Sequence, residues 1–170
     1  MRTLAKKYLG GLPIEENAYK VDLAVLERYQ SFSSELLRLS LLGIAGYGFL
    51  IANVIFKAGP DNKYIFLERF ANSKYLLAAG AIALGISAVA ALGHRYFSTD
   101  CLTHFVRRVR LSQRMADTEN PDDKRTIEHE EESLDADLTR CKWFLEIACI
   151  SLLIGVACVA FVFASTLFIY

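Results

Sequence analysis

Residues 147–170 read IACISLLIGVACVAFVFASTLFIY, a stretch without any Asp, Glu, Lys, Arg or His. Two other stretches share this property, namely the 18 residues between Arg38 and Lys57 and the 19 residues between Lys74 and His94. As helices these stretches would span about 36, 27 and 28 Å, and the hydrocarbon core of a bilayer is roughly 30 Å thick. A helix in a soluble core keeps a polar stripe, which these stretches lack. The sequence therefore predicts an all-α integral membrane protein. We expect its transmembrane helices at about 39–57, 75–94 and 147–168.

The 170 residues suit a single membrane domain, 1–170, in which each span continues as a helix outside the bilayer. Apolar residues recur at steps of three and four from Ile14 to Leu39, and no Gly or Pro interrupts the pattern from Ile14 until Gly43. This spacing predicts a helix over 14–38 that runs into the first span. We expect three long helices, at about 14–57, 74–117 and 122–170, and an external loop over 58–73.

The segment 95–142 is predicted to form a helical hairpin that turns near Asn120 and Pro121. On its first arm Phe97, Cys101 and Phe105 follow one another at steps of four. On the second arm Ile127, Leu134 and Cys141 form one seven-residue series, and Leu138 and Leu145 form another, which is typical of a coiled-coil seam. Antiparallel charge pairs should reinforce the hairpin, with Arg110 facing residue 130 or 131. The candidate residues are Arg107, Arg110, Arg114, Glu128, Glu131 and Asp135.

The distribution of Lys and Arg predicts the orientation of the chain. Six of these residues precede the first span and a further group lies in 95–142, but the connection 58–73 holds only Lys63 and Arg69. Because Lys and Arg are retained on the cytoplasmic side, the N-terminus, the helix 14–38 and the hairpin are expected in the cytoplasm and the C-terminus outside. The expected location is a bacterial inner membrane.

Small residues on the predicted spans indicate close helix packing. Gly, Ala or Ser occupy 11 of the 19 residues from Tyr75 to Gly93. In lipid, such residues let helix backbones approach one another. The candidate packing or oligomerisation residues are Gly43, Gly46, Ala81, Gly85 and Gly93. Because three helices cannot easily bury all of these faces within one chain, we expect a homo-oligomer, with packing inside one chain as the alternative.

No catalytic residues, cofactor or metal site are predicted. The spans lack the central ionisable residue that a proton relay or an intramembrane hydrolase requires. Asn53 is the one strongly polar residue within a span, where it either lines a pore or bonds a neighbouring helix. The three histidines and four cysteines match no metal-ligand spacing, so the cysteines are expected to be reduced, buried residues. The acidic run 128–132 is expected to be a solvated face, with its acids paired to arginines, and no nucleic-acid partner is expected.

Three function hypotheses follow, of which the least favoured is an enzyme that uses cytoplasmic residues at the membrane surface. The first is an oligomeric membrane effector or channel whose hairpin senses a signalling ligand or a protein partner in the cytoplasm. The second is a non-enzymatic scaffold or accessory subunit that docks a cytoplasmic protein. Through its spans and the hairpin from His94 to Arg140, the chain resembles in architecture the SLATT-type effectors of bacterial conflict systems. That resemblance implies membrane permeabilisation as the output of a defence response, and it assigns no functional residue.

Overall fold

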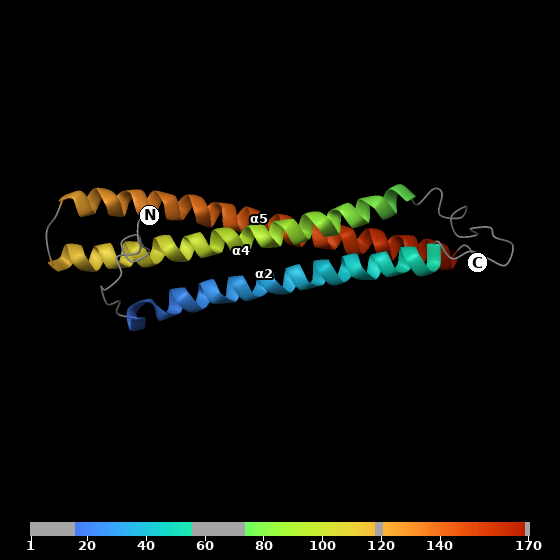
Figure 1. Cartoon of the computed structure of the whole chain (residues 1–170), viewed down its shortest axis with the longest axis horizontal. Helices are drawn as coiled ribbons and strands as arrows, with labels where there is room; N and C mark the ends of the chain where they lie inside the picture. The colour runs from blue at the N-terminus through green and yellow to red at the C-terminus, as the bar shows by residue number, and fades with distance from the viewer. Residues whose placement is uncertain (1–15, 56–73, 118–120, 169–170) are drawn as a thin grey trace. The chain divides into compact units, whose positions relative to one another are not determined.

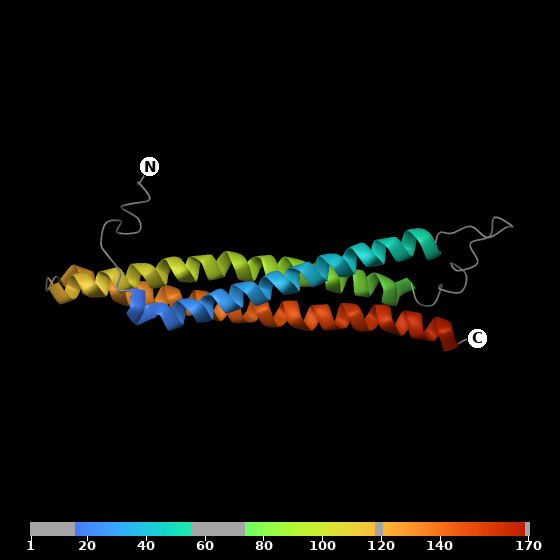
Figure 2. The ribbon, with the colours of Figure 1, turned by 90° about the horizontal axis from the view of Figure 1, so that it is seen from below.

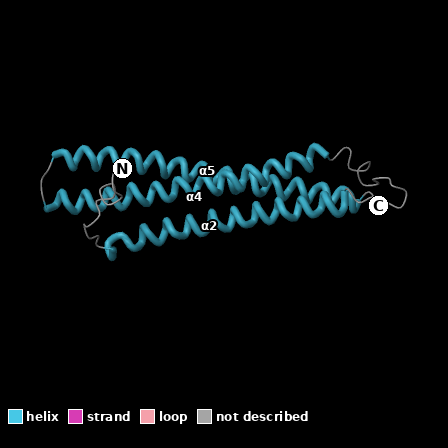
Figure 3. The backbone as a smooth tube through the Cα atoms, viewed as in Figure 1, coloured by secondary structure: helices cyan, strands magenta, loops and turns pink. Residues whose placement is uncertain are grey.

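The computed structural model describes residues 16–55, 74–117 and 121–168, all of which are helical (Figures 1 and 3). Helix α2 covers Glu16–Leu50 and continues as a π-helical turn over Ile51–Ile55. Helix α4 covers Lys74–Asp117, and helix α5 covers Pro121–Phe168. The prediction of a wholly helical protein is confirmed for this part of the chain. The predicted loop 58–73 and the residue Asn120 lie outside the described residues.

Helices α2, α4 and α5 each contain a stretch that is long and apolar enough to cross a membrane. These stretches lie within Tyr19–Asn53, Lys74–Arg114 and Lys124–Ala164. Their length follows from the absence of helix breakers and charges in the segments identified above. The prediction of three candidate membrane-spanning helices is thus confirmed for the part of the chain that the structure describes.

The chain divides into two compact units, and every long helix contributes to both. We call residues 1–32 and 93–144 the hairpin unit, and residues 33–92 and 145–170 the span unit. Within the hairpin unit, α4 and α5 lie side by side, and the C-terminal end of α4 meets the N-terminal end of α5 (Figures 1 and 2). The hairpin unit contains the charged side chains described below, whereas the span unit contains the small residues.

Three buried serines form the polar interior of the span unit. Ser33, Ser40 and Ser87 are fully inaccessible to solvent. The Oγ atoms of Ser40 and Ser87 lie 2.8 Å apart. The Ser40 hydroxyl is also 2.7 Å from the carbonyl oxygen of Leu36, and the Ser87 hydroxyl is 2.8 Å from the carbonyl oxygen of Ala148. Each hydroxyl has one hydrogen to donate, so two of these three contacts are hydrogen bonds at any one time. The chain of contacts joins α2, α4 and α5 in an otherwise apolar setting, where such bonds stabilise helix association.

Two glycines of the span unit allow α4 and α5 to approach closely. A Cβ atom placed on Gly155 would lie 2.7 Å from Cγ of Leu84 and 3.2 Å from the carbonyl oxygen of Gly80. A Cβ atom on Gly80 would lie 3.1 Å from Cβ of Cys158. Because part of this obstruction is backbone, a larger residue at position 155 cannot be accommodated by side-chain rotation alone. Gly80 was not named among the candidate packing residues from the sequence.

Candidate functional site

The seam of the hairpin unit is built from two heptad-like series that face each other. Cys101 of α4 packs with Leu134 and Cys141 of α5, and Phe97 and Phe105 cover this cluster. The predicted series containing Leu134 and Cys141 is therefore in the seam. The other predicted series is wrong at Leu138, which is 46% exposed. A different seven-residue series, formed by Glu130, Asp137 and Phe144, takes the place in the seam that was predicted for the Leu138 series.

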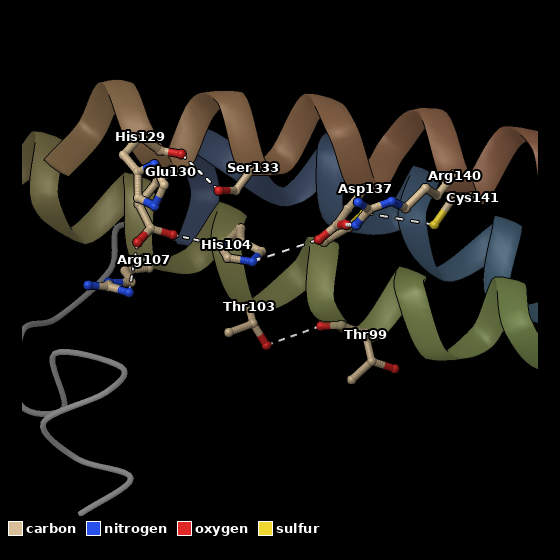
Figure 4. A network of polar contacts seen from close by, with 11 residues as sticks. Thr99, Thr103, His104, Arg107, His129, Glu130, Ser133, Asp137, Arg140 and Cys141 are labelled. Carbon is tan, nitrogen blue, oxygen red and sulfur yellow. Dashed lines mark hydrogen bonds and ion pairs between the residues drawn. The ribbon is translucent and has the colours of Figure 1, made fainter. Parts of the chain in front are cut away.

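Glu130 and Asp137 bring two carboxylates into this seam. Glu130 is 3% exposed and Asp137 is 7% exposed. They lie seven residues apart on α5, so they point to the same side of the helix. His104 of α4 lies opposite both of them (Figure 4). Its Nδ1 atom is 2.6 Å from Oε2 of Glu130, and its Nε2 atom is 3.7 Å from Oδ2 of Asp137.

Two arginines balance the charge of these carboxylates. Arg107 places Nη1 2.7 Å from Oε1 of Glu130, and Arg140 places Nη1 2.8 Å from Oδ1 of Asp137. Two carboxylates and two guanidinium groups sum to zero, so the cluster is neutral when the imidazole of His104 is neutral and carries one positive charge when it is protonated. We call His104, Arg107, Glu130, Asp137 and Arg140 the charge cluster. A buried carboxylate is stable only with such partners, which makes the cluster specific for one helix register.

The predicted charge pairs are distributed differently in the structure. Glu131 pairs with Arg108, whose Nη2 lies 2.7 Å from its Oε1 in a half-exposed setting. Residues 130 and 131 thus pair with Arg107 and Arg108, which lie two to three positions before Arg110. The pairing of Arg110 itself stays a prediction. The remaining candidates are divided between half-buried Arg110 and the exposed residues Arg114, Glu128 and Asp135.

Sequence reasoning missed His104, Glu130 and Asp137 as seam residues. It assigned the acidic run to a solvated face because charged residues are rarely buried. A signal was present in the spacing. On α4, steps of four and three residues lead from Phe97 to Cys101 and on to His104. On α5, the same two steps lead from Glu130 to Leu134 and on to Asp137. A polar residue at a repeated heptad position is a known device for fixing register.

The candidate packing glycines fall into two groups. Gly43 and Gly93 are used within the chain, because added Cβ atoms would lie 3.1 Å from Leu84 and 2.8 Å from Phe144, respectively. Added Cβ atoms on Gly46, Gly48 and Gly85 would meet no atom within 4 Å among the described residues. Ala81 is half-buried. The structure thus uses part of the predicted small surface and leaves another part open.

Asn53 lies in the π-helical turn and is exposed. Its Nδ2 donates a hydrogen bond of 2.9 Å to the carbonyl oxygen of Phe49, one turn earlier on the same helix. This contact secures the side chain against its own backbone. Both interpretations of Asn53, a pore-lining residue and a bond to another helix, stay predictions.

An apolar groove lies between α2 and the two arms of the hairpin unit. Its cavity volume is about 410 Å³. Asp22 and Arg108 are its charged residues. Tyr19 of α2 makes an edge contact with Phe105 of α4, with ring centroids 5.7 Å apart. The other lining residues are Leu23, Val25, Leu26, Tyr29, Cys101, Phe105, Leu134 and Leu138.

Comparison with models of protein families, with curated proteins and with solved structures finds no match to this chain. Within the described residues, no group of three or more His, Cys, Asp or Glu side chains is arranged to hold a metal ion. The fold and site therefore define a class only: an all-helical protein with three candidate membrane-spanning helices and a charged helical hairpin.

Proposed function

We propose that the protein is a membrane effector that acts by self-association. In this proposal the span unit lies in a bacterial inner membrane, and the hairpin unit projects into the cytoplasm as a sensing or docking element. Large apolar side chains on all three helices of the span unit support insertion, because Leu42, Val89 and Leu153 are exposed in the isolated chain. Such side chains are stable in contact with lipid.

The observation that carries self-association is a set of open glycines in the span unit, Gly46 and Gly48 on α2 and Gly85 on α4. A Cβ atom at any of these positions would meet nothing within 4 Å in the described structure. Glycine is expensive in a helix, at about 1 kcal/mol relative to alanine, and in membranes it is used where another helix must approach. Since this chain provides no such helix at these positions within the described residues, a second copy is the proposed neighbour.

The orientation in this proposal rests on the distribution of Lys and Arg. The hairpin arms carry Arg95, Arg107, Arg108, Arg110 and Arg114 on α4 alone. Translocation of such a segment across the membrane is disfavoured, so it is retained in the cytoplasm. The charge cluster holds the two arms in one register and thereby presents a defined surface to a signalling ligand or a protein partner.

The proposed output is permeabilisation of the membrane by the assembled spans. Asn53 is exposed, and as a polar side chain in an otherwise apolar segment it is suited to line a narrow path between copies. The test is dye leakage from liposomes that contain the purified full chain. Gly85→Leu should abolish leakage, and Ala79→Leu, which places the same bulky side chain at an exposed position of α4 about 120° around the helix from Gly85, should retain it. Equal leakage from both variants would contradict the proposed role of Gly85.

A second function is supported by the apolar side chains on the hairpin-unit part of α2. Val21, Val25 and Phe32 are exposed there, next to the groove. Such a surface is suited to bind an amphipathic helix of another protein. In this alternative the protein is a scaffold or accessory subunit. Liposomes with the wild-type chain would then retain their dye, and the chain would be monomeric.

A further inference from the structure

Cys101 and Cys141 bring two thiols into contact across the hairpin seam. Their Sγ atoms lie 3.8 Å apart, although the residues are 40 positions apart in sequence. Cys101 is 1% exposed and Cys141 is 8% exposed. Cys101 belongs to α4 and Cys141 to α5, so a bond between the two sulfurs would join the arms of the hairpin covalently.

The surroundings of the pair favour one reactive thiolate. A hydrogen bond from the Cys101 thiol lowers the pKa of Cys141, while burial and the carboxylates of Asp137 and Asp100 act against this shift. The same hydrogen bond, together with burial, raises the pKa of Cys101. The thiolate is the nucleophilic form of cysteine, so one sulfur of the pair attacks first and the other resolves the product.

A small oxidant can reach the pair through the groove. Cys101 lines the cavity of about 410 Å³, together with the apolar side chains of Leu26, Phe105 and Leu134. This volume is more than ten times the roughly 30 Å³ that one water molecule occupies in the liquid. An uncharged oxidant with two oxygen atoms, such as a peroxide, therefore fits into this cavity, whereas the apolar lining disfavours charged reagents.

We propose that Cys101 and Cys141 form a dithiol site that hydrogen peroxide converts to a disulfide across the seam. In the first step the thiolate attacks one peroxide oxygen, the O–O bond breaks, and the products are a sulfenic acid and hydroxide, which is protonated to water. In the second step the other sulfur attacks the sulfenic sulfur, an S–S bond forms, the S–O bond breaks, and the thiol proton leaves with the hydroxyl group as water. In total, two thiols lose two electrons and two protons, and one peroxide becomes two molecules of water.

The geometry requires a modest movement. A disulfide has an S–S distance of about 2.05 Å, so the sulfurs must approach by roughly 2 Å through side-chain rotation and a small shift of the helices. The resulting bond would clamp the arms one helical turn away from the contact between His104 and Asp137. This site does not depend on the proposed function.

The test uses the full chain, reduced and reconstituted in nanodiscs, and titrates it with hydrogen peroxide. After alkylation and proteolysis, mass spectrometry should identify a peptide pair linked through Cys101 and Cys141 within one chain, with simultaneous loss of both alkylatable thiols and recovery on reduction with dithiothreitol. The double variant Cys149→Ser/Cys158→Ser should give the same linked peptides. Cys101→Ser should give none, and its Cys141 should instead be trapped as a sulfenic acid by dimedone.

Three results would overturn the proposal. In the first, both thiols are retained although peroxide has oxidised Met residues of the same chain. In the second, disulfide links form only between chains. In the third, the cysteines are converted to sulfinic acid without any linked peptide. Circular dichroism of Cys101→Ser checks that the helices are retained. If that variant loses helicity, the wild-type titration alone decides, because it measures both thiols in the unaltered protein.

Discussion

Removing Arg107 from the charge cluster should open the hairpin far more than removing its neighbour Arg108. In Arg107→Gln, the side chain of Glu130, which is 4% exposed, loses its guanidinium partner and, among the described residues, keeps His104. Breaking a fully buried ion pair costs about 3–5 kcal/mol. Because Arg107 is 36% exposed and the imidazole remains, we expect a smaller loss of ~2–3 kcal/mol in the free energy of hairpin opening. Arg108 pairs with Glu131 where both side chains are half-exposed, so Arg108→Gln should cost about 0–1 kcal/mol.

The measurement is amide hydrogen exchange of both variants in nanodiscs, followed in peptides from 124–140. Exchange that proceeds through opening of the hairpin reports the free energy of that opening. At 1.4 kcal/mol per factor of ten, Arg107→Gln should exchange ~30- to ~150-fold faster than wild type, and Arg108→Gln no more than about 5-fold faster. Glu130→Gln in the Arg107→Gln background should recover part of the loss, because the buried charge is then gone. Equal acceleration in the two single variants would refute the argument that burial of Glu130 makes the difference.

Three further predictions concern packing and orientation. Leu134→Ala should destabilise the hairpin by about 2–5 kcal/mol and Leu138→Ala by much less, because Leu134 is buried and Leu138 is exposed. The same hydrogen-exchange experiment compares the two variants, and a larger effect at Leu138 would contradict the observed seam. Gly155→Ala should destabilise the span unit by about 1–3 kcal/mol through contact with Leu84, whereas Gly48→Ala should not. Unfolding in sodium dodecyl sulfate measures this difference, and similar unfolding midpoints for the two variants would argue against the close approach of α4 and α5. Asp61→Cys should react with an impermeant thiol reagent added outside intact cells and Thr118→Cys should not, and the reverse pattern would invert the proposed orientation.

The helices could be predicted from the sequence because their cause is local. Stretches free of charge and of proline, such as 147–168, determine helix length and apolarity without reference to any other segment. The series of Leu134 and Cys141 could be identified in the same way, because its spacing and its apolar character agree.

The charge cluster could not be derived in this way. Glu130 belongs to the acidic run, which the sequence pattern assigned to solvent, and apolar periodicity placed Leu138 in the seam. The burial of Glu130 and Asp137 depends on His104 and Arg107 arriving from α4 in one register, which is a property of two helices together. The two sulfurs of Cys101 and Cys141 depend on the same register.

The division of the glycines has a similar origin. Gly43 and Gly85 look equivalent in sequence, because each lies in a small-residue face of a predicted span. Only the packed structure distinguishes Gly43, where an added Cβ atom would lie 3.1 Å from Leu84, from Gly85, where an added Cβ atom would meet nothing within 4 Å in the described part of the chain. The sequence therefore identifies the set of small residues, and the three-dimensional packing selects those that remain open for another helix.

Self-association in the membrane is tested most directly by the mass of the full chain in lipid nanodiscs, measured over a range of protein-to-lipid ratios. The wild-type protein should have a mass that is a fixed multiple of 19.0 kDa. Gly85→Leu should shift this mass towards that of a single chain, while Ala79→Leu, at an exposed position on another face of α4, should not. A wild-type protein that stays monomeric at every ratio would contradict the proposed effector and leave the scaffold as the better explanation.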